Sequence, residues 1–130
     1  SGDFRWLLKE TDLWSYVDSK LYSKVINLVE KSDREQAFFH DQGLNSKFKR
    51  FISYLDAFYH HIAMNTVPEN FGGGNVTGFK PARIVSDEEY QRLRLLSKEA
   101  NELASVAWDE LNGLSVAIRK RLPRSSNPGA

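Results

Sequence analysis

The sequence contains no cysteine, so disulfide bonds, thiolate catalysis and cysteine-based zinc sites are all excluded. It has no run of about 18 apolar residues, the length that a helix needs to cross a bilayer. Its formal net charge is only +1, so no strong overall field attracts nucleic acid or acidic lipid. The first residues lack the basic and apolar regions of a signal peptide. These absences predict a cytoplasmic protein without a membrane span.

The residues that are present have the composition of a folded domain. Hydrophobic residues make up 41% of the 130 residues, charged residues 27% and aromatic residues 12%, so we expect a core rich in aromatic side chains. This length suits one domain, which we predict over residues 1–124. Residues 125–130, SSNPGA, have the composition of a linker. Because the chain begins with Ser1-Gly2 and no methionine, we expect it to be part of a longer protein.

Apolar residues recur at steps of three and four in three segments. This period predicts helices over residues 12–31, 46–66 and 86–122. The connection Gly43-Leu44-Asn45 before the helix over residues 46–66 is short, so this helix should pack antiparallel on its predecessor. No segment shows a convincing alternation of polar and apolar residues, and no strand is expected. The sequence therefore predicts an all-α fold, an antiparallel helical bundle of roughly three to five helices.

Capping residues indicate where the early helices end. Thr11 can accept a hydrogen bond from an amide of the first turn, so it is the expected N-cap of the first helix. Ser32 and Glu35 have the spacing of a capping box, which leaves two alternatives. Either a second short helix follows and ends at Gly43, or the first helix continues.

The predicted C-terminal helix is the longest. Ser86 and Glu89 form a second capping box at its start, and Pro123 ends it. Gly113 is its weak point, because glycine inside a helix costs about 1 kcal/mol against alanine, so the helix is either unbroken or split there. An unbroken helix would span about 50 Å at about 1.5 Å per residue. That exceeds what a compact bundle needs, so the surplus is available to a partner.

The glycine-rich stretch NFGGGNVTGF, residues 70–79, has the glycine content of a phosphate-binding loop without its context. Such loops follow a strand and lead directly into a helix, and a P-loop ends in Lys followed by Ser or Thr. Here a helix precedes the glycines, the next begins only near Asp87, and Thr77 is followed by Gly78. We therefore expect a crossover loop between two long helices, and we retain it as a candidate recognition loop.

One pair of residues is a candidate for catalysis. Arg34 and His40 are separated by five residues, a spacing that resembles the motif of HEPN-type ribonucleases. In that family the arginine holds the scissile phosphate, the histidine handles the proton, and two helical bundles dimerise to build the site. The resemblance implies a small helical nuclease.

A second pair is a candidate for metal binding. Asp56 and His60 are four residues apart, so they share one face of the predicted helix over residues 46–66. His40 would have to join them to complete a metal site. No serine nucleophile motif is present, and nothing in the sequence indicates a cofactor.

Two tryptophans and two basic clusters are candidates for partner binding. Trp6 lies in the apolar segment FRWLL, which either docks on its own bundle or inserts into the groove of a partner. Trp108 lies on the predicted long helix, and Arg119 and Arg121 lie in its last turn, where positive charge also suits the negative helix end. The other basic cluster consists of Lys47, Lys49 and Arg50. A nucleic-acid surface would require both clusters on one face.

Because no constellation of catalytic groups is convincing, we predict a non-catalytic protein–protein interaction or assembly module without a cofactor. Its partner is another protein or a second copy of the chain. The expected partner contacts are Trp6, Trp108, Arg119 and Arg121. The alternative is a small helical nuclease or nucleic-acid-binding domain, which the small net charge does not favour.

Overall fold

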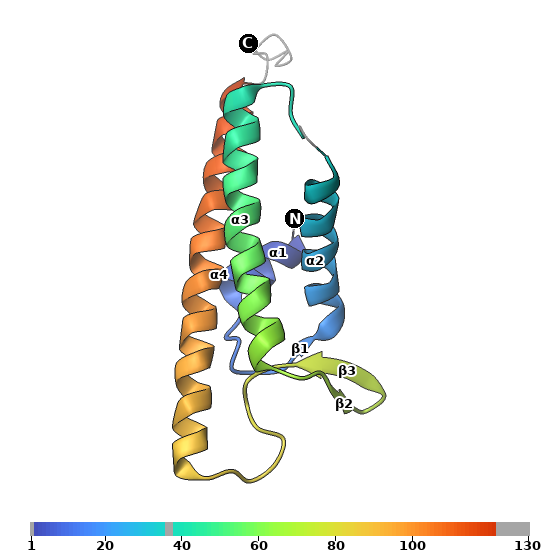
Figure 1. The fold of residues 1–130 in the computed structure, drawn as a ribbon, viewed down its shortest axis with the longest axis vertical. Coiled ribbons are helices and arrows are strands. Elements are labelled where there is room, and N and C mark those ends of the chain that lie inside the picture. Colours follow the sequence, from blue (N-terminus) through green and yellow to red (C-terminus); the bar gives the residue numbers. More distant parts are fainter. Residues whose placement is uncertain (1, 36–37, 122–130) are drawn as a thin grey trace, which may run out of the picture.

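The computed structural model describes residues 2–35 and 38–121. The expected linker at residues 125–130 and the helix end at Pro123 lie outside the described residues. The described chain is mostly helical, with a small three-stranded sheet beside the long helices (Figure 1). None of the described helices is long and apolar enough to cross a bilayer.

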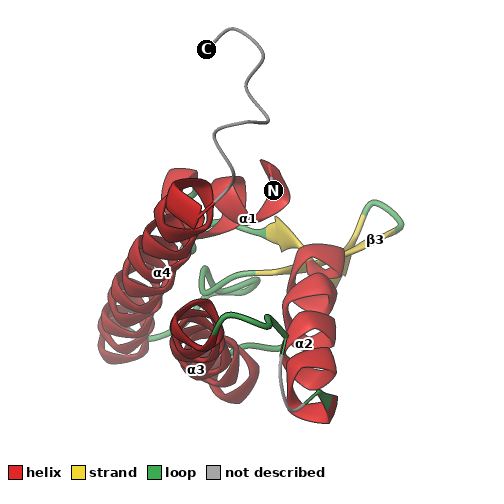
Figure 2. Ribbon diagram, turned by 90° about the horizontal axis from the view of Figure 1, so that it is seen from above, coloured by secondary structure: helices red, strands yellow, loops and turns green. Residues whose placement is uncertain are grey.

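Three long helices lie side by side: α2 (Ser19–Arg34), α3 (Gln42–Asn65) and α4 (Asp87–Arg121). Seen from above, α3 lies between the other two, and it packs against both (Figures 1 and 2). α3 and α4 run in opposite directions, so α4 ends beside the start of α3. The buried side chains of α3 recur at the predicted helical spacing; they are Leu44, Phe48, Phe51, Ile52, Leu55, Phe58 and Ile62.

The chain before α2 does not form the helix predicted from residue 12. It forms α1 (Gly2–Arg5), the π-helix η1 (Trp6–Glu10), a turn and the short strand β1 (Val17–Asp18). η1 packs on α4, and its side chains Leu7 and Leu8 are buried. The apolar segment around Trp6 is therefore docked on the helices of its own chain.

The N-cap expected at Thr11 is wrong. Thr11 ends η1, and α2 begins only after Asp18, whose side-chain carboxylate accepts a hydrogen bond from the Lys20 amide at 3.0 Å. Val17 is buried because it pairs with Thr77 in the sheet. Val17 also lies at helical spacing from the apolar residues of α2. From the sequence alone, its burial in a strand could therefore not be distinguished from burial in a helix.

The capping box expected at Ser32 and Glu35 is also wrong. Ser32 is buried within α2, which continues to Arg34. Lys49 closes this helix, because its ammonium group donates to the carbonyl oxygens of Ser32 and Glu35 at 3.0 Å each. The first helix therefore continues past Ser32, which was one of the two alternatives.

Gly43 lies in the first turn of α3 and not in a loop. Asp41 is the N-cap of α3, since its carboxylate accepts a hydrogen bond from the Leu44 amide at 3.0 Å. The same carboxylate contacts the guanidinium of Arg121 at 2.8 Å. The start of α3 and the end of α4 are therefore joined by one ion pair.

The prediction of an all-α fold is wrong, because the glycine-rich stretch forms a β-hairpin. β2 (Glu69–Phe71) and β1 both pair antiparallel with β3 (Gly74–Thr77), in the order β1-β3-β2. Gly72 and Gly73 form the turn, with φ of +58° and +82°, which side-chain-bearing residues rarely adopt. The strands are too short to show a polar and apolar alternation, so periodicity could not reveal them.

The hairpin is held close to the N-terminal turn. A Cβ atom on Gly78 would lie 2.7 Å from the Ser15 carbonyl oxygen, so only glycine permits this approach. The Tyr16 hydroxyl donates to the Lys80 carbonyl at 2.6 Å, which fixes the chain leaving β3. The hairpin is therefore a fixed part of the fold.

α4 is helical from Asp87 to Arg121, Gly113 included. Its predicted capping residue is confirmed, because the Ser86 hydroxyl accepts a hydrogen bond from the Glu89 amide at 3.1 Å. The buried residues of α4 begin only at Ser97; they are Ser97, Ala100, Ala104, Ala107, Leu114 and Ala117. The early part of this helix therefore contributes little to the core.

Candidate partner-binding face

The three histidines do not meet. His40 is exposed and precedes α3, whereas His60 and His61 lie near the end of α3. The His61 ring packs between helices, with Nε2 2.8 Å from the Leu96 carbonyl oxygen. A site that needs more than one imidazole is therefore not formed by these residues.

The nuclease pair spans the connection between α2 and α3. Arg34 is the last residue of α2 and His40 lies in the bend before α3, and both are exposed. Neither side chain makes a hydrogen bond or ion pair with another residue in the described part of the chain. Residues 36–37, which lie between them, are outside the described residues.

The metal-binding pair does come together, but alone. His60 Nδ1 lies 3.2 Å from Asp56 Oδ1 on the exposed surface of α3. Residues 2–35 and 38–121 contain no group of three or more His, Cys, Asp or Glu side chains arranged to hold a metal ion. The contact is therefore an ordinary hydrogen bond between side chains one helix turn apart.

The two basic clusters lie at the same end of the molecule, because α3 begins where α4 ends (Figure 1). One arginine of each cluster is paired with a carboxylate of the same chain. Arg50 Nε donates to Glu110 Oε1 at 2.6 Å, and this hydrogen bond raises the pKa of the guanidinium. Arg121 pairs with Asp41, whose pKa is lowered, chiefly by the Leu44 amide and also by Arg121. Arg119 remains exposed.

The predicted tryptophans lie where the N-terminal segment meets α4. Trp108 is half-buried, and the ammonium group of Lys9 lies 5.6 Å from its ring centroid. Trp6 is 42% exposed on η1. Trp108 therefore serves chiefly to seat η1, and Trp6 is the more accessible of the two.

Sequence reasoning did not locate one surface that leaves apolar side chains exposed, near the start of α4. α4 extends beyond the end of α3 (Figure 1), and none of its residues 87–96 is buried. Leu95 in this part is 63% exposed, and Ile84 in the loop before it is fully exposed. Met64, one turn after His61 on α3, is 79% exposed. The expected surplus of the long helix is thus present at its first turns.

A shallow groove continues this surface along α4. Its volume is about 350 Å³, and it is lined by Glu99, Glu102, Leu103 and Val106. Leu95 and Val106 lie about three helical turns apart on the same side of the helix. We call these five residues, from Leu95 to Val106, the α4 outer face. It combines exposed apolar side chains with two carboxylates.

Comparison of the chain with family models, with curated proteins and with solved structures gives no significant match. The function must therefore be argued from the arrangement of the side chains.

Proposed function

We propose that this protein is a non-catalytic interaction module, and that it binds a helix of another protein along the α4 outer face. The observation that carries the proposal is the groove lined by Leu103, Val106, Glu99 and Glu102, with exposed Leu95 farther along the same side of the helix. Such a strip of exposed apolar side chains on the outer side of a long helix is suited to a further helix.

The chemistry of the groove defines the partner. An apolar side chain of the partner would contact Leu103 and Val106, which removes their surface from water. Lysine or arginine side chains of the partner, one helical turn from that apolar side chain, would face Glu99 and Glu102. The Glu99 side chain is 60% exposed, and Glu102 is also exposed. The partner is therefore an amphipathic helix with basic residues beside its apolar stripe.

A second copy of the chain fits this face less well. In an antiparallel pair that brings Leu95 against Val106, symmetry also brings Glu99 against Glu102 of the other copy. In a parallel pair each glutamate faces the same glutamate of the other chain. Like charges in contact are destabilising in either case, so a different protein is favoured over self-association on this face.

A synthetic helical peptide of leucine and lysine is a suitable probe. Added to labelled protein, it should shift the amide signals of residues 95–106 in a saturable way, whereas a leucine–glutamate peptide should not. Light scattering at two protein concentrations should give the monomer mass at both. Shifts spread over the whole surface, or none with either peptide, would exclude this face as the binding site.

A charge-reversed variant tests the role of the carboxylates. Glu99→Lys with Glu102→Lys should weaken binding of the lysine peptide and permit binding of the glutamate peptide. Glu30→Lys with Asp33→Lys is the matched control, since these exposed acids have the same spacing on α2. Equal effects of the two double variants would show that only net charge matters.

A further inference from the structure

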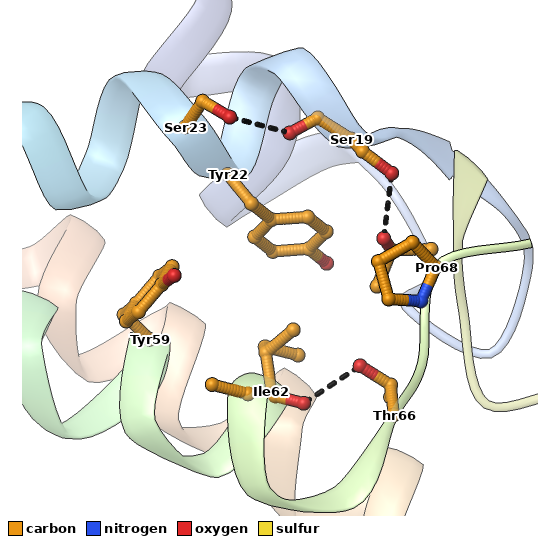
Figure 3. Close-up of a pocket in the computed structure, with 9 residues that line it drawn as sticks. Ser19, Tyr22, Ser23, Tyr59, Ile62, Thr66 and Pro68 are labelled. Atoms are coloured by element: carbon orange, nitrogen blue, oxygen red, sulfur yellow. Dashed lines mark hydrogen bonds between the residues drawn. The ribbon is translucent and has the colours of Figure 1, made fainter. Parts of the chain in front are cut away.

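A second site lies between α2 and α3, away from the α4 outer face. It is a cleft of about 260 Å³ that lies beside the hairpin (Figure 3). Its lining consists of Ser19, Tyr22, Ser23, Tyr59, Ile62, Ala63, Thr66, Pro68 and Thr77. Two helices and the end of β3 contribute to it. The cleft therefore depends on how these elements pack together and is not formed by any one of them.

The lining contains no charged side chain. A charged ligand that left water here would find no opposite charge, and the desolvation cost would be uncompensated. Aromatic rings, Ile62, Ala63 and Pro68 offer apolar surface, and the serine and threonine side chains offer hydroxyl groups. The cleft therefore selects an uncharged molecule that is apolar over most of its surface.

Tyr22 is the polar group that distinguishes this cleft. Its side chain is only 5% exposed and packs on Phe58, with ring centroids 6.0 Å apart. Its hydroxyl makes no hydrogen bond to another described residue, and in Figure 3 it points along the cleft toward Pro68. No fully buried side-chain nitrogen or oxygen of the described residues lacks a partner. The Tyr22 hydroxyl therefore reaches the space of the cleft, where a ligand atom can meet it.

The serine and threonine hydroxyls of the cleft are already engaged. Thr66 donates to the Ile62 carbonyl oxygen at 2.6 Å, and the hydroxyls of Ser19 and Thr77 share a hydrogen bond of 2.8 Å. Burial raises the pKa of Tyr22, so its hydroxyl keeps its proton and acts as a donor. The complementary group on a ligand is an oxygen that accepts a hydrogen bond.

The size of the cleft limits the ligand. A dry cavity of about 150 Å³ accepts a benzene ring, so this cleft holds a ring with a short substituent. The rings of Tyr22 and Tyr59 line it from α2 and α3, and rings of this kind favour an aromatic neighbour in offset or edge-on packing. We propose that the cleft binds a small uncharged aromatic molecule whose carbonyl oxygen accepts a hydrogen bond from Tyr22.

Three probes of similar shape test the proposal. Acetophenone has the ring and the carbonyl, ethylbenzene lacks the oxygen, and benzoate carries a charge. Measured by amide shifts of residues 19–23 and 59–68, acetophenone should bind about two- to tenfold more tightly than ethylbenzene, and benzoate most weakly. If no probe gives a saturable shift, the cleft holds water only and the proposal is wrong. Benzoate binding as tightly as acetophenone would also overturn it.

Two variants locate the binding. Tyr22→Phe removes the hydroxyl and keeps the ring, so acetophenone should lose its advantage while the affinity for ethylbenzene stays the same. Ala63→Phe places a ring in the cleft and should abolish binding of both probes. Ala57→Phe is the matched control, because Ala57 is also an exposed alanine of α3 but does not line the cleft. Unchanged acetophenone affinity in Tyr22→Phe, or equal losses in the two alanine variants, would contradict the proposal.

Discussion

The two parts of α4 have different surroundings although they form one continuous helix. From Ser97 onward, short side chains such as Ala100 and Ala107 are fully buried against the rest of the fold. Residues 87–96 bury no side chain, and Leu95 there is 63% exposed. Capping and helix propensity determined where this helix begins, whereas the position of α3 determined which part is buried. Residues 87–96 are therefore accessible on more sides, whereas from Ser97 onward only the outer side, with Glu99, Glu102, Leu103 and Val106, is open to another molecule.

The largest expected difference in stability is between two leucine-to-alanine variants, one in each part of α4. Leu114→Ala removes a side chain that is 4% exposed, and it should lower the free energy of unfolding by about 2–5 kcal/mol. Leu95→Ala, on the same helix, should change it by no more than about 0.5 kcal/mol. Urea unfolding measures both. Similar losses would show that residues 87–96 are packed against the fold after all.

The alanines of the buried part should be sensitive to added volume. Ala107→Leu would force a larger side chain into a fully buried position and should cost about 1–3 kcal/mol. Val106→Leu is the control, because Val106 is 39% exposed and the extra carbon extends into solvent. Thermal unfolding should separate the two variants clearly. A neutral Ala107→Leu would mean that α3 and α4 can move apart at little cost.

Replacing a glycine by alanine should have opposite effects on stability in α4 and in the hairpin turn. Gly113 is helical, and a Cβ added there meets nothing within 4 Å, so Gly113→Ala should raise the free energy of unfolding by about 0.5–1 kcal/mol. Gly73→Ala should lower it, because its φ of +82° is unfavourable for alanine. The same urea measurement serves for both. A gain in both variants would contradict the turn geometry of the hairpin.

The long helices could be predicted because their apolar residues are numerous and regularly spaced. α3 and α4 follow from such stripes, and Ser86 marks the start of α4. α2 was less secure, because Leu21 and Leu28 also recur at helical spacing, whereas the structure buries their neighbours Tyr22 and Val29. Half-buried and buried apolar residues alternate on this helix, so periodicity alone could not choose between the two faces.

The candidate sites depend on contacts that sequence spacing does not contain. Ser19 and Thr77 meet in the cleft although they are 58 residues apart, because the hairpin pairs with β1. The Gly72-Gly73 pair was a usable signal for a two-residue hairpin turn, but its flanking strands were too short to support it. For the α4 outer face, the helix length indicated surplus surface, and only the packing of α4 showed that this surface includes Leu95 and the groove up to Val106.

The smallest expected effect concerns Asp12, which ties the N-terminal turn to α4 near the boundary between its two parts. Its carboxylate accepts hydrogen bonds from the Trp14 amide at 3.0 Å and from the Asn101 side chain at 3.1 Å. These bonds, Trp14 first, lower the pKa of Asp12 in the folded state, with a further contribution from Arg94. The resulting stabilisation is complete above the unfolded pKa of about 3.9 and is lost as the pH falls through the lower folded value.

Asp12→Asn should therefore be less stable than the wild type at pH 6, and the difference should shrink as the pH falls below about 4. Denaturant unfolding from pH 6 to pH 2 measures this difference directly, and the wild type serves as the reference at each pH. A difference that stayed constant over this range would mean that the two hydrogen bonds, and not the ionised carboxylate, hold the N-terminal turn on α4. The boundary of the buried part would then be insensitive to acid, and the contrast between the two parts of α4 would rest on packing alone.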